Sequence, residues 1–225
     1  MVNNLNTIVA VYTGQGLSEL LQKIFKEKLP QYRFVNIIDD SMIHDVIKVG
    51  KVDKKVIRRL IQYYQIAADM GADIIINTCS SVGEVADIAE NIIDVPIVKI
   101  DEPMAIKAVK YFRNIGVLAT LPTTLDPTIK LIKSKADILG KNVLIKEGLA
   151  KGAYQALISG RSEEHDRLIY ETAQGLSKEV DCIVLAQGSM ARIQEKLHKE
   201  TGIEVLESPS LCAEYVKSLL GGSKA

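Results

Sequence analysis

Short apolar runs rich in β-branched residues alternate along the chain with longer segments whose apolar positions recur at helical spacing. Between residues 53 and 70, for example, Val56, Leu60, Tyr64 and Ala67 fall on one face of a helix. Helices between successive strands predict parallel sheets covered on both faces, which is an α/β fold. The predicted strands are residues 7–14, 33–39, 73–79, 96–100, 114–120, 142–147, 181–187 and 203–208.

The second half of the chain repeats the pattern of the first. Residues 8–13 (IVAVYT) align with residues 115–120 (IGVLAT), 107 positions further on. Residues 74–79 (IIINTC) align with residues 182–187 (CIVLAQ), 108 positions further on. Two blocks at nearly the same separation indicate a duplicated βαβ unit, although short apolar strands also match by chance.

This repeat predicts two pseudo-symmetric Rossmann-like halves, each a mainly parallel sheet flanked by helices. We expect residues 1–100 to form the N-terminal half, with residues 207–225 returning to it as a last helix, and residues 101–206 to form the other. Ligands of open parallel sheets bind beyond the carboxyl ends of the strands. The active site is therefore expected in the cleft between the halves.

Small polar residues follow four of the predicted strands. The segments that follow these strands, called strand exits below, offer hydroxyl and amide groups but no arginine. This composition suits a small carboxylate better than a nucleotide. The Gly14-Gln15-Gly16 sequence lacks the third glycine of a dinucleotide fingerprint and is interpreted as a tight turn. The candidate residues are Thr13, Gly14 and Gln15; Cys79, Ser80 and Ser81; Thr120, Thr123 and Thr124; and Gln187, Gly188 and Ser189.

Cys79 is the residue with the clearest chemical potential. It follows an apolar strand and precedes Ser-Ser-Val-Gly at a predicted helix start, where a helix dipole favours the thiolate. The alternative is a small buried apolar residue, as free cysteines often are. Cys182, in a predicted strand, and Cys212, in a predicted helix, are expected to pack in the core. Three widely spaced cysteines favour reduced thiols in a cytoplasm over disulfides or a zinc site.

Other polar groups receive structural interpretations. Ser162 precedes Glu163 and Glu164 and is expected to cap a helix instead of helping to form a metal site. Arg58 and Arg59 are assigned to an exposed helix face. After Thr120, a loop containing Thr123 and Thr124 is expected to lead to a helix over residues 126–139.

Charge and hydropathy exclude several classes of partner. The chain has 28 basic and 28 acidic residues, so no net field attracts nucleic acid or an anionic membrane. No apolar run approaches the roughly 20 residues that cross a bilayer. The first residues have no basic region or small-residue cleavage site and are interpreted as leading into a strand, not as a signal peptide. We therefore expect a cytoplasmic protein with a small-molecule substrate.

The motifs at the strand exits resemble those of the aspartate/glutamate/hydantoin racemase superfamily, over nearly the whole chain. The resemblance implies a cofactor-independent isomerase, without metal or pyridoxal phosphate, that moves a proton at the carbon beside a small carboxylate. It also implies a homo-oligomer, a dimer or larger. The motifs are IIINTCSSVGE (74–84), IGVLATLPTTLDPT (115–128), EEHDRLI (163–169) and VLAQGSMAR (184–192).

The resemblance also assigns roles to individual residues. Cys79 matches the first of the two catalytic cysteines, but the position of the second is Gln187. Glutamine cannot exchange a proton at neutral pH, so Gln187 is expected to hold the substrate. The groups implied to contact the substrate carboxylate are Ser80 and Ser81, in place of the usual Asn-Thr, and Thr120, Thr123 and Thr124.

Three functions are compatible with a single cysteine in this setting. The first is a racemase, epimerase or cis–trans isomerase in which Cys79 acts as acid or base, or as a nucleophile. The second is a lyase or decarboxylase on the same scaffold. The third is a non-catalytic protein that binds a small carboxylate.

Overall fold

The computed structural model describes residues 6–222 and divides into two compact units. The first unit contains the residues up to Ile100 and those from Pro209 onward. The second unit is Asp101–Ser208. The chain thus leaves the first unit after Ile100 and returns to it at Pro209.

The first unit is built on a four-stranded parallel sheet in the order β2-β1-β3-β4. Because β1 and β3 are its two central strands, the loops that follow them emerge side by side at the carboxyl edge. The strands are β1 (Thr7–Tyr12), β2 (Arg33–Ile38), β3 (Ile74–Asn77) and β4 (Ile97–Lys99). The helices are α1 (Ser18–Lys28), α2 (Met42–Val49), α3 (Lys54–Asp69), α4 (Gly83–Ala89) and α10 (Ser208–Gly222).

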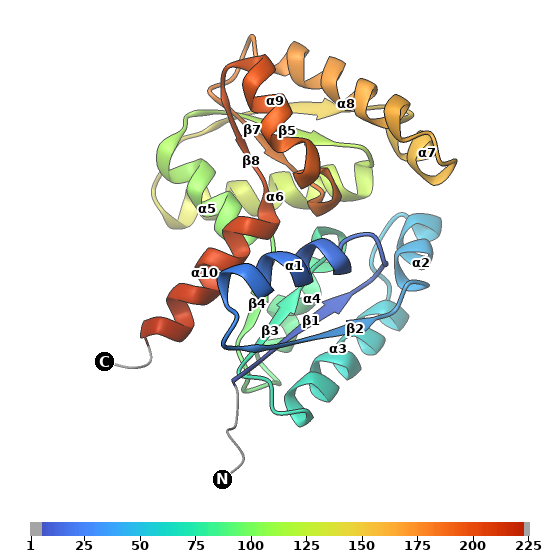
Figure 1. Cartoon of the computed structure of the whole chain (residues 1–225), viewed down its shortest axis with the longest axis vertical. Coiled ribbons are helices and arrows are strands. Elements are labelled where there is room, and N and C mark those ends of the chain that lie inside the picture. Colours follow the sequence, from blue (N-terminus) through green and yellow to red (C-terminus); the bar gives the residue numbers. More distant parts are fainter. Residues whose placement is uncertain (1–5, 223–225) are drawn as a thin grey trace. The chain divides into compact units, whose positions relative to one another are not determined.

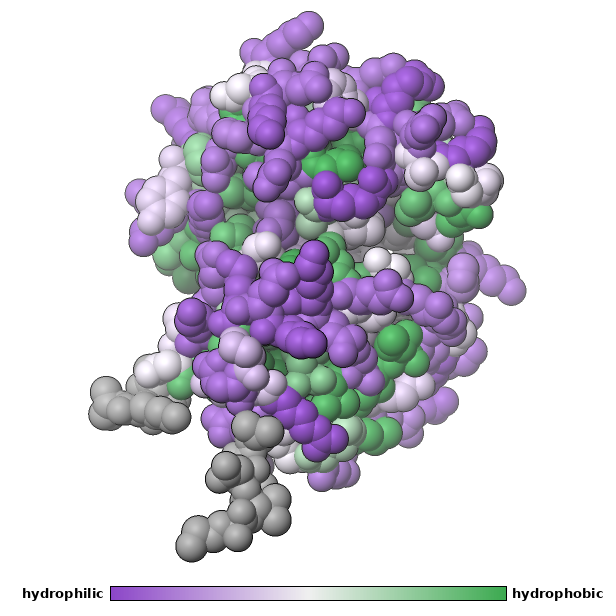
Figure 2. Space-filling view, in the orientation of Figure 1, coloured by the Kyte–Doolittle hydropathy of each residue, from purple (hydrophilic) through white to green (hydrophobic). Residues whose placement is uncertain are grey.

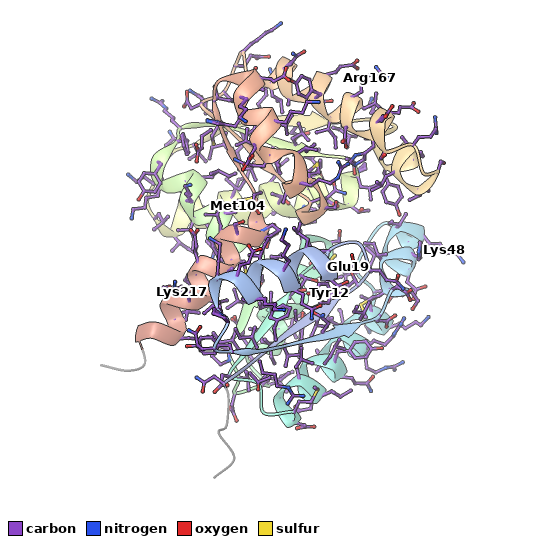
Figure 3. The ribbon with its side chains drawn as sticks, viewed as in Figure 1. Tyr12, Glu19, Lys48, Met104, Arg167 and Lys217 are labelled. Carbon is purple, nitrogen blue, oxygen red and sulfur yellow. The ribbon has the colours of Figure 1, made fainter. Side chains whose placement is uncertain are left out.

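Helices cover this sheet on both faces. Val9 and Val11 of β1 pack with apolar residues of α2, α3 and α4, whereas Ile8 and Ala10 pack with α1 and α10. Figure 1 shows α1 and α10 together on one side of the sheet. Tyr12 lies beneath α1 (Figure 3), where its hydroxyl donates to Asn36 Oδ1 at 2.9 Å. Burial on both faces explains why the central strands are continuously apolar.

The second unit has the same strand order, β6-β5-β7-β8, again with every neighbouring pair parallel. One of its cores joins β5, β7 and β8 to helices α7, α8 and α9. The α/β fold and all eight strands expected from the sequence are confirmed. The strands are β5 (Asn114–Ala119), β6 (Leu144–Leu149), β7 (Cys182–Leu185) and β8 (Glu204–Leu206); the helices are α5 (Glu102–Tyr111), α6 (Pro122–Ile138), α7 (Ala153–Ile158), α8 (Ser162–Leu176) and α9 (Gln194–Thr201).

The same hydrogen bond ties the amino edge of each sheet. Asp73, just before β3, accepts the backbone N–H of Thr7 at the start of β1, at 2.6 Å. Asp181, just before β7, accepts the backbone N–H of Asn114 at the start of β5, at 2.9 Å. These four residues occupy corresponding positions in the two alignments. A chance match of apolar strands would not reproduce a specific carboxylate contact, so the observation supports duplication.

Two helix starts differ from the sequence expectation. Helix α6 begins at Pro122, not near Asp126, because proline is well placed in a first turn where its missing N–H is not needed. Pro127 then lies inside the helix. Ser162 is the first residue of α8, and Arg161 occupies the N-cap position without a side-chain cap bond. Ser162 is therefore not a capping residue.

Polar residues cover most of the face shown in Figure 2. Within residues 6–222, no helix combines the length and apolar character needed to span a membrane.

Gly148 in β6 lies close against helix α8. A Cβ at this position would lie 2.4 Å from Leu176 Cδ1 and 3.2 Å from Thr172 Cγ2, both on α8. We predict that Gly148→Ala lowers the free energy of unfolding by about 1–3 kcal/mol through overpacking. Urea unfolding measures the change.

The matched control is Gly175→Ala on α8, the helix that Gly148 faces. A Cβ added at Gly175 would meet no heavy atom within 4 Å. This substitution should be neutral or stabilising by up to about 1 kcal/mol, since alanine favours helix. Equal effects of the two substitutions would contradict the packing account.

Candidate active site

The backbone of Cys79 is held in place by the two residues that precede it. The Cys79 N–H donates to Asn77 Oδ1 at 3.5 Å, and Asn77 Nδ2 donates to the Cys79 carbonyl at 3.4 Å. The Thr78 hydroxyl donates to the Val11 carbonyl of the adjacent strand at 2.9 Å. Cys79 itself is partly buried and packs against the core formed with α3 and α4. Its thiol is therefore carried by a backbone fixed to the two central strands.

Ser80 and Ser81 lie in a 3₁₀ turn, Ser80–Val82, that leads into α4. The sequence predicts a helix to about Ile93, but α4 ends at Ala89. One 3₁₀ turn thus separates Cys79 from the start of α4, which is shorter than the helix expected from the sequence.

The loop after β1 lies beside the Cys79 exit, because β1 and β3 are hydrogen-bonded neighbours. The buried Thr13 accepts the Ile43 N–H through its carbonyl at 3.1 Å. A Cβ on Gly14 would lie 3.5 Å from Ile43 Cγ2, so this loop packs against the start of α2. The Gln15 amide donates to Asp40 Oδ2 at 2.6 Å. Thr13 and Gly14 thus border the Cys79 exit, while Gln15 is directed toward Asp40.

Arg59 forms an ion-pair network with the loop that follows β2, contrary to its assignment to an exposed helix face. Its guanidinium donates to Asp39 and, at 3.0 Å, to Asp45 Oδ2. The Asp39 carboxylate also accepts the Ser41 hydroxyl at 2.7 Å and the Tyr63 hydroxyl at 2.9 Å. Burial opposes the ionisation of Asp39, but the bonds from Ser41 and Tyr63 and the Arg59 charge outweigh it and lower its pKa.

Lys99 is a second cation at this edge that sequence reasoning missed. It ends β4 opposite Asn77, its side chain is only 12% exposed, and its ammonium pairs with Asp87 of α4. Its stem passes Gly83, where an added Cβ would lie 3.6 Å from Lys99 Cδ. A lysine at the last position of an otherwise apolar strand was the available signal, but the sequence does not reveal its ion-pair partner.

In the second unit, Gln187 and Thr120 are hydrogen-bonded to each other. Gln187 Oε1 accepts the Thr120 backbone N–H at 2.6 Å and the Thr120 hydroxyl at 3.0 Å. A backbone N–H can only donate, so this contact fixes the carbonyl side of the amide toward Thr120. The Gln187 NH₂ group is consequently directed away from Thr120, as a pair of N–H donors.

The neighbouring candidates belong to turns and not to open loops. Thr123 and Thr124 lie in the first turn of α6, and Thr124 is buried. Gly188 and Ser189 begin a 3₁₀ turn, Gly188–Ile193, and are partly buried. The expected Thr-bearing loop is therefore a helix N-terminus next to the Gln187 exit.

A polar cluster around the buried His165 anchors the turn that follows Gln187. Arg192, near the end of this turn, donates to Asp166 Oδ2 at 2.7 Å and lies 3.3 Å from His165 Nδ1. His165 is 2% exposed, and its Nδ1 lies 2.8 Å from Asp166 Oδ1. Burial opposes ionisation of Asp166, but its bonds to Arg192 and His165 lower its pKa. The motifs EEHDRLI and VLAQGSMAR are thus linked through space.

The two remaining cysteines are buried in the packed interior, as expected. Cys182 and Cys212 are both fully buried. Burial, together with the nearby Asp181 and Glu204, raises the pKa of Cys182 to about 12, so it remains a thiol. Within residues 6–222, no group of three or more histidine, cysteine or acidic residues is placed to hold a metal ion. Of the three cysteines, only Cys79 is partly exposed.

Each unit thus brings two of the predicted exits together, Thr13 with Cys79 and Thr120 with Gln187. The alignment of the two halves also predicts a cleft in which the Cys79 exit faces the Gln187 exit and the Thr13 exit faces the Thr120 exit, and this stays a prediction.

Residues 8–216 match the family model of the Asp/Glu/hydantoin racemases. The chain belongs to this family. The match includes both of the sheets described above and every candidate residue. It confirms the resemblance inferred from the motifs at the strand exits. No curated protein matches the sequence significantly.

Solved structures of racemases have the same fold. A glutamate racemase from Francisella tularensis in complex with D-glutamate is 17% identical, with a TM-score of 0.73 over 98% of this chain and 82% of that one. An allantoin racemase from Klebsiella pneumoniae is 14% identical, with a TM-score of 0.74 over 98% and 89%. An aspartate racemase from Picrophilus torridus is 15% identical, with a TM-score of 0.73 over 96% and 94%. The family fold is thus shared across racemases named for three different substrates.

The Arg59 network predicts a pH-dependent contribution to stability. The pKa of Asp39 is lower in the folded protein than in the unfolded chain, where it is near 4. Asp39 therefore stabilises the folded protein above about pH 4, and this stabilisation is lost as the pH falls through the pKa of the folded protein. We predict that Arg59→Met lowers the free energy of unfolding by about 2 kcal/mol at pH 7, since it leaves a buried carboxylate without its cation. Below about pH 4, the free energies of unfolding of Arg59→Met and of the parent protein should become more similar.

Urea unfolding at pH 7 and pH 3 measures both effects. Arg58→Met is the control, because Arg58 is exposed on the same helix. A loss of stability that is as large at pH 3 as at pH 7 would rule out this electrostatic explanation.

Proposed function

We propose that this protein is a cofactor-independent isomerase that acts on a small carboxylate, with Cys79 as its reacting thiol. Membership of the Asp/Glu/hydantoin racemase family supports the reaction class. The observation that most supports the role of Cys79 is its position: it follows a central strand, and the Asn77 side chain holds its backbone. A fixed backbone limits the positions that the thiol can occupy, which a proton transfer to carbon requires.

In the proposed reaction, the Cys79 thiolate removes the hydrogen beside the substrate carboxylate. The C–H bond breaks, an S–H bond forms, and the electron pair moves toward the carboxylate. Hydrogen-bond donors near that group stabilise the charge as it develops, and one such donor typically contributes about 100- to 1,000-fold in rate. We assign this role to the hydroxyl groups of Ser80 and Ser81 beside Cys79 and of Thr13 on the adjacent strand exit.

Gln187 is proposed to bind the substrate and not to transfer a proton. Its carbonyl oxygen is occupied by two bonds from Thr120, which leaves its NH₂ group to donate to a carboxylate oxygen. An amide neither takes up nor releases a proton at neutral pH. Inversion requires the returning proton to reach the face of the carbon opposite to Cys79, so this proton comes from water, and the reaction uses one thiol.

A second candidate follows from the same observation. Because Gln187 cannot serve as an acid, Cys79 can instead add as a nucleophile to an activated double bond, permit rotation, and leave again. Such a cis–trans isomerase would convert an unsaturated dicarboxylate without exchange of a hydrogen beside the carboxylate. A binding protein without turnover is the outcome to expect if neither reaction occurs.

We predict that Cys79→Ala abolishes conversion in a panel of aspartate, glutamate, hydantoins, maleate and substituted malonates. Chiral chromatography and proton NMR follow the products, and circular dichroism checks the fold. Cys212→Ala is the control, because Cys212 lies on the buried side of α10 and has no proposed role in catalysis. Conversion by the Cys79→Ala variant at the parent rate would contradict the proposed role.

Gln187→Glu tests the role of the amide. A glutamate keeps oxygens for the two Thr120 donors but replaces the NH₂ donor with a negative charge. We expect KM to rise about 10- to 100-fold, the effect of losing a hydrogen bond to a charged group, with a smaller change in kcat. Unchanged KM would indicate that Gln187 does not contact the substrate.

A further inference from the structure

The hydroxyl group of Tyr64 is buried without a hydrogen-bond partner. Tyr64 lies on α3, its side chain is 0% exposed, and no group among residues 6–222 pairs with its hydroxyl. An unpaired buried polar group costs about 1–3 kcal/mol, so natural structures contain few of them. Phenylalanine would fill the same space without this cost.

Tyr64 and Cys79 belong to the same packed region. Tyr64 is a member of the core between β1, β3 and helices α2, α3 and α4, together with Val82 and Val85. Cys79 packs against this core from the strand exit. Cys79 is thus partly exposed and also contacts the core that contains Tyr64.

The charged groups around the Tyr64 hydroxyl come from the Cys79 exit and α4. Burial, followed by the negative charges of Cys79 and Asp87, raises the pKa of Tyr64 well above its usual range. The hydroxyl therefore stays protonated and acts as a donor wherever Cys79 titrates. Asp87 is 58% exposed and already pairs with Lys99, so it is partly compensated by its own partner. Asp39 and Arg59 pair with each other at the end of β2, on the far side of β1.

We propose that Tyr64 is a positioning residue whose hydroxyl donates to the Cys79 thiolate once it forms. A small rotation of the Cys79 side chain would bring the sulfur to the unpaired donor, and the resulting bond would stabilise the ionised form. The cost of the unpaired hydroxyl in the resting protein is then offset in the reactive state. This inference rests on the proposed function only in taking Cys79 as the reacting thiol.

The test measures the thiol and requires no substrate. Iodoacetamide alkylation of Cys79, followed by mass spectrometry between pH 5 and 10, gives the pKa of this thiol directly. We expect Tyr64→Phe to slow alkylation at pH 7 about three- to tenfold and to move the profile to higher pH, the effect of one hydrogen bond on an ionisation. Its melting temperature should equal or exceed that of the parent.

Tyr170→Phe is the matched control. The Tyr170 hydroxyl is also buried without a partner among the described residues, but it lies on α8 of the second unit. Loss of the Tyr170 hydroxyl should leave the pH dependence of Cys79 alkylation unchanged. Superimposable profiles of the parent and Tyr64→Phe would overturn the proposal, whether or not the protein proves to be an isomerase.

Asp87→Asn separates a direct effect of Tyr64 from one that passes through Asp87. Removing this negative charge should speed alkylation by itself, because it favours the thiolate. Tyr64→Phe should still slow alkylation in the Asp87→Asn background. If it has no effect there, the hydroxyl acts through Asp87 and the proposed bond to Cys79 is wrong.

Discussion

Parallel pairing of the two central strands of each sheet is the constraint on which the candidate site depends. β1 pairs with β3, and β5 pairs with β7, so the loops after these strands emerge next to each other. Strands buried on both faces leave their carboxyl edge as the place where polar side chains can gather. Thr13 and Cys79 in the first unit, and Thr120 and Gln187 in the second, are neighbours for this reason.

The two units are alike at the amino edge of the sheet and different at the carboxyl edge. Asp73 and Asp181 make the same backbone contact in each unit, which stabilises the start of the central strand. At the other edge, Cys79 is held through Asn77, whereas Gln187 is held through Thr120. The difference bears on chemistry, because one exit presents a thiol that can ionise and the other an amide that cannot.

The sequence was sufficient to predict the strands and their alternation with helices along the chain, because buried parallel strands are short, apolar and regularly separated by helices. It was insufficient for contacts that join distant segments. Arg59 follows Arg58 in a charged helix, and only tertiary structure shows that Arg59 alone meets Asp39. The same holds for Lys99, whose partner lies on α4, and for Tyr64, whose apolar spacing predicted a core residue but not an unpaired hydroxyl.

The proposed isomerase function depends most on whether Cys79 exchanges a proton with the carbon beside a carboxylate. Incubation of the parent protein and Cys79→Ala in heavy water with the carboxylate panel, followed by proton NMR, tests this claim directly. We expect loss of the signal of one such hydrogen with the parent protein and retention of that signal with Cys79→Ala. Conversion of a substrate by the parent without any exchange, or exchange that persists in Cys79→Ala, would contradict it.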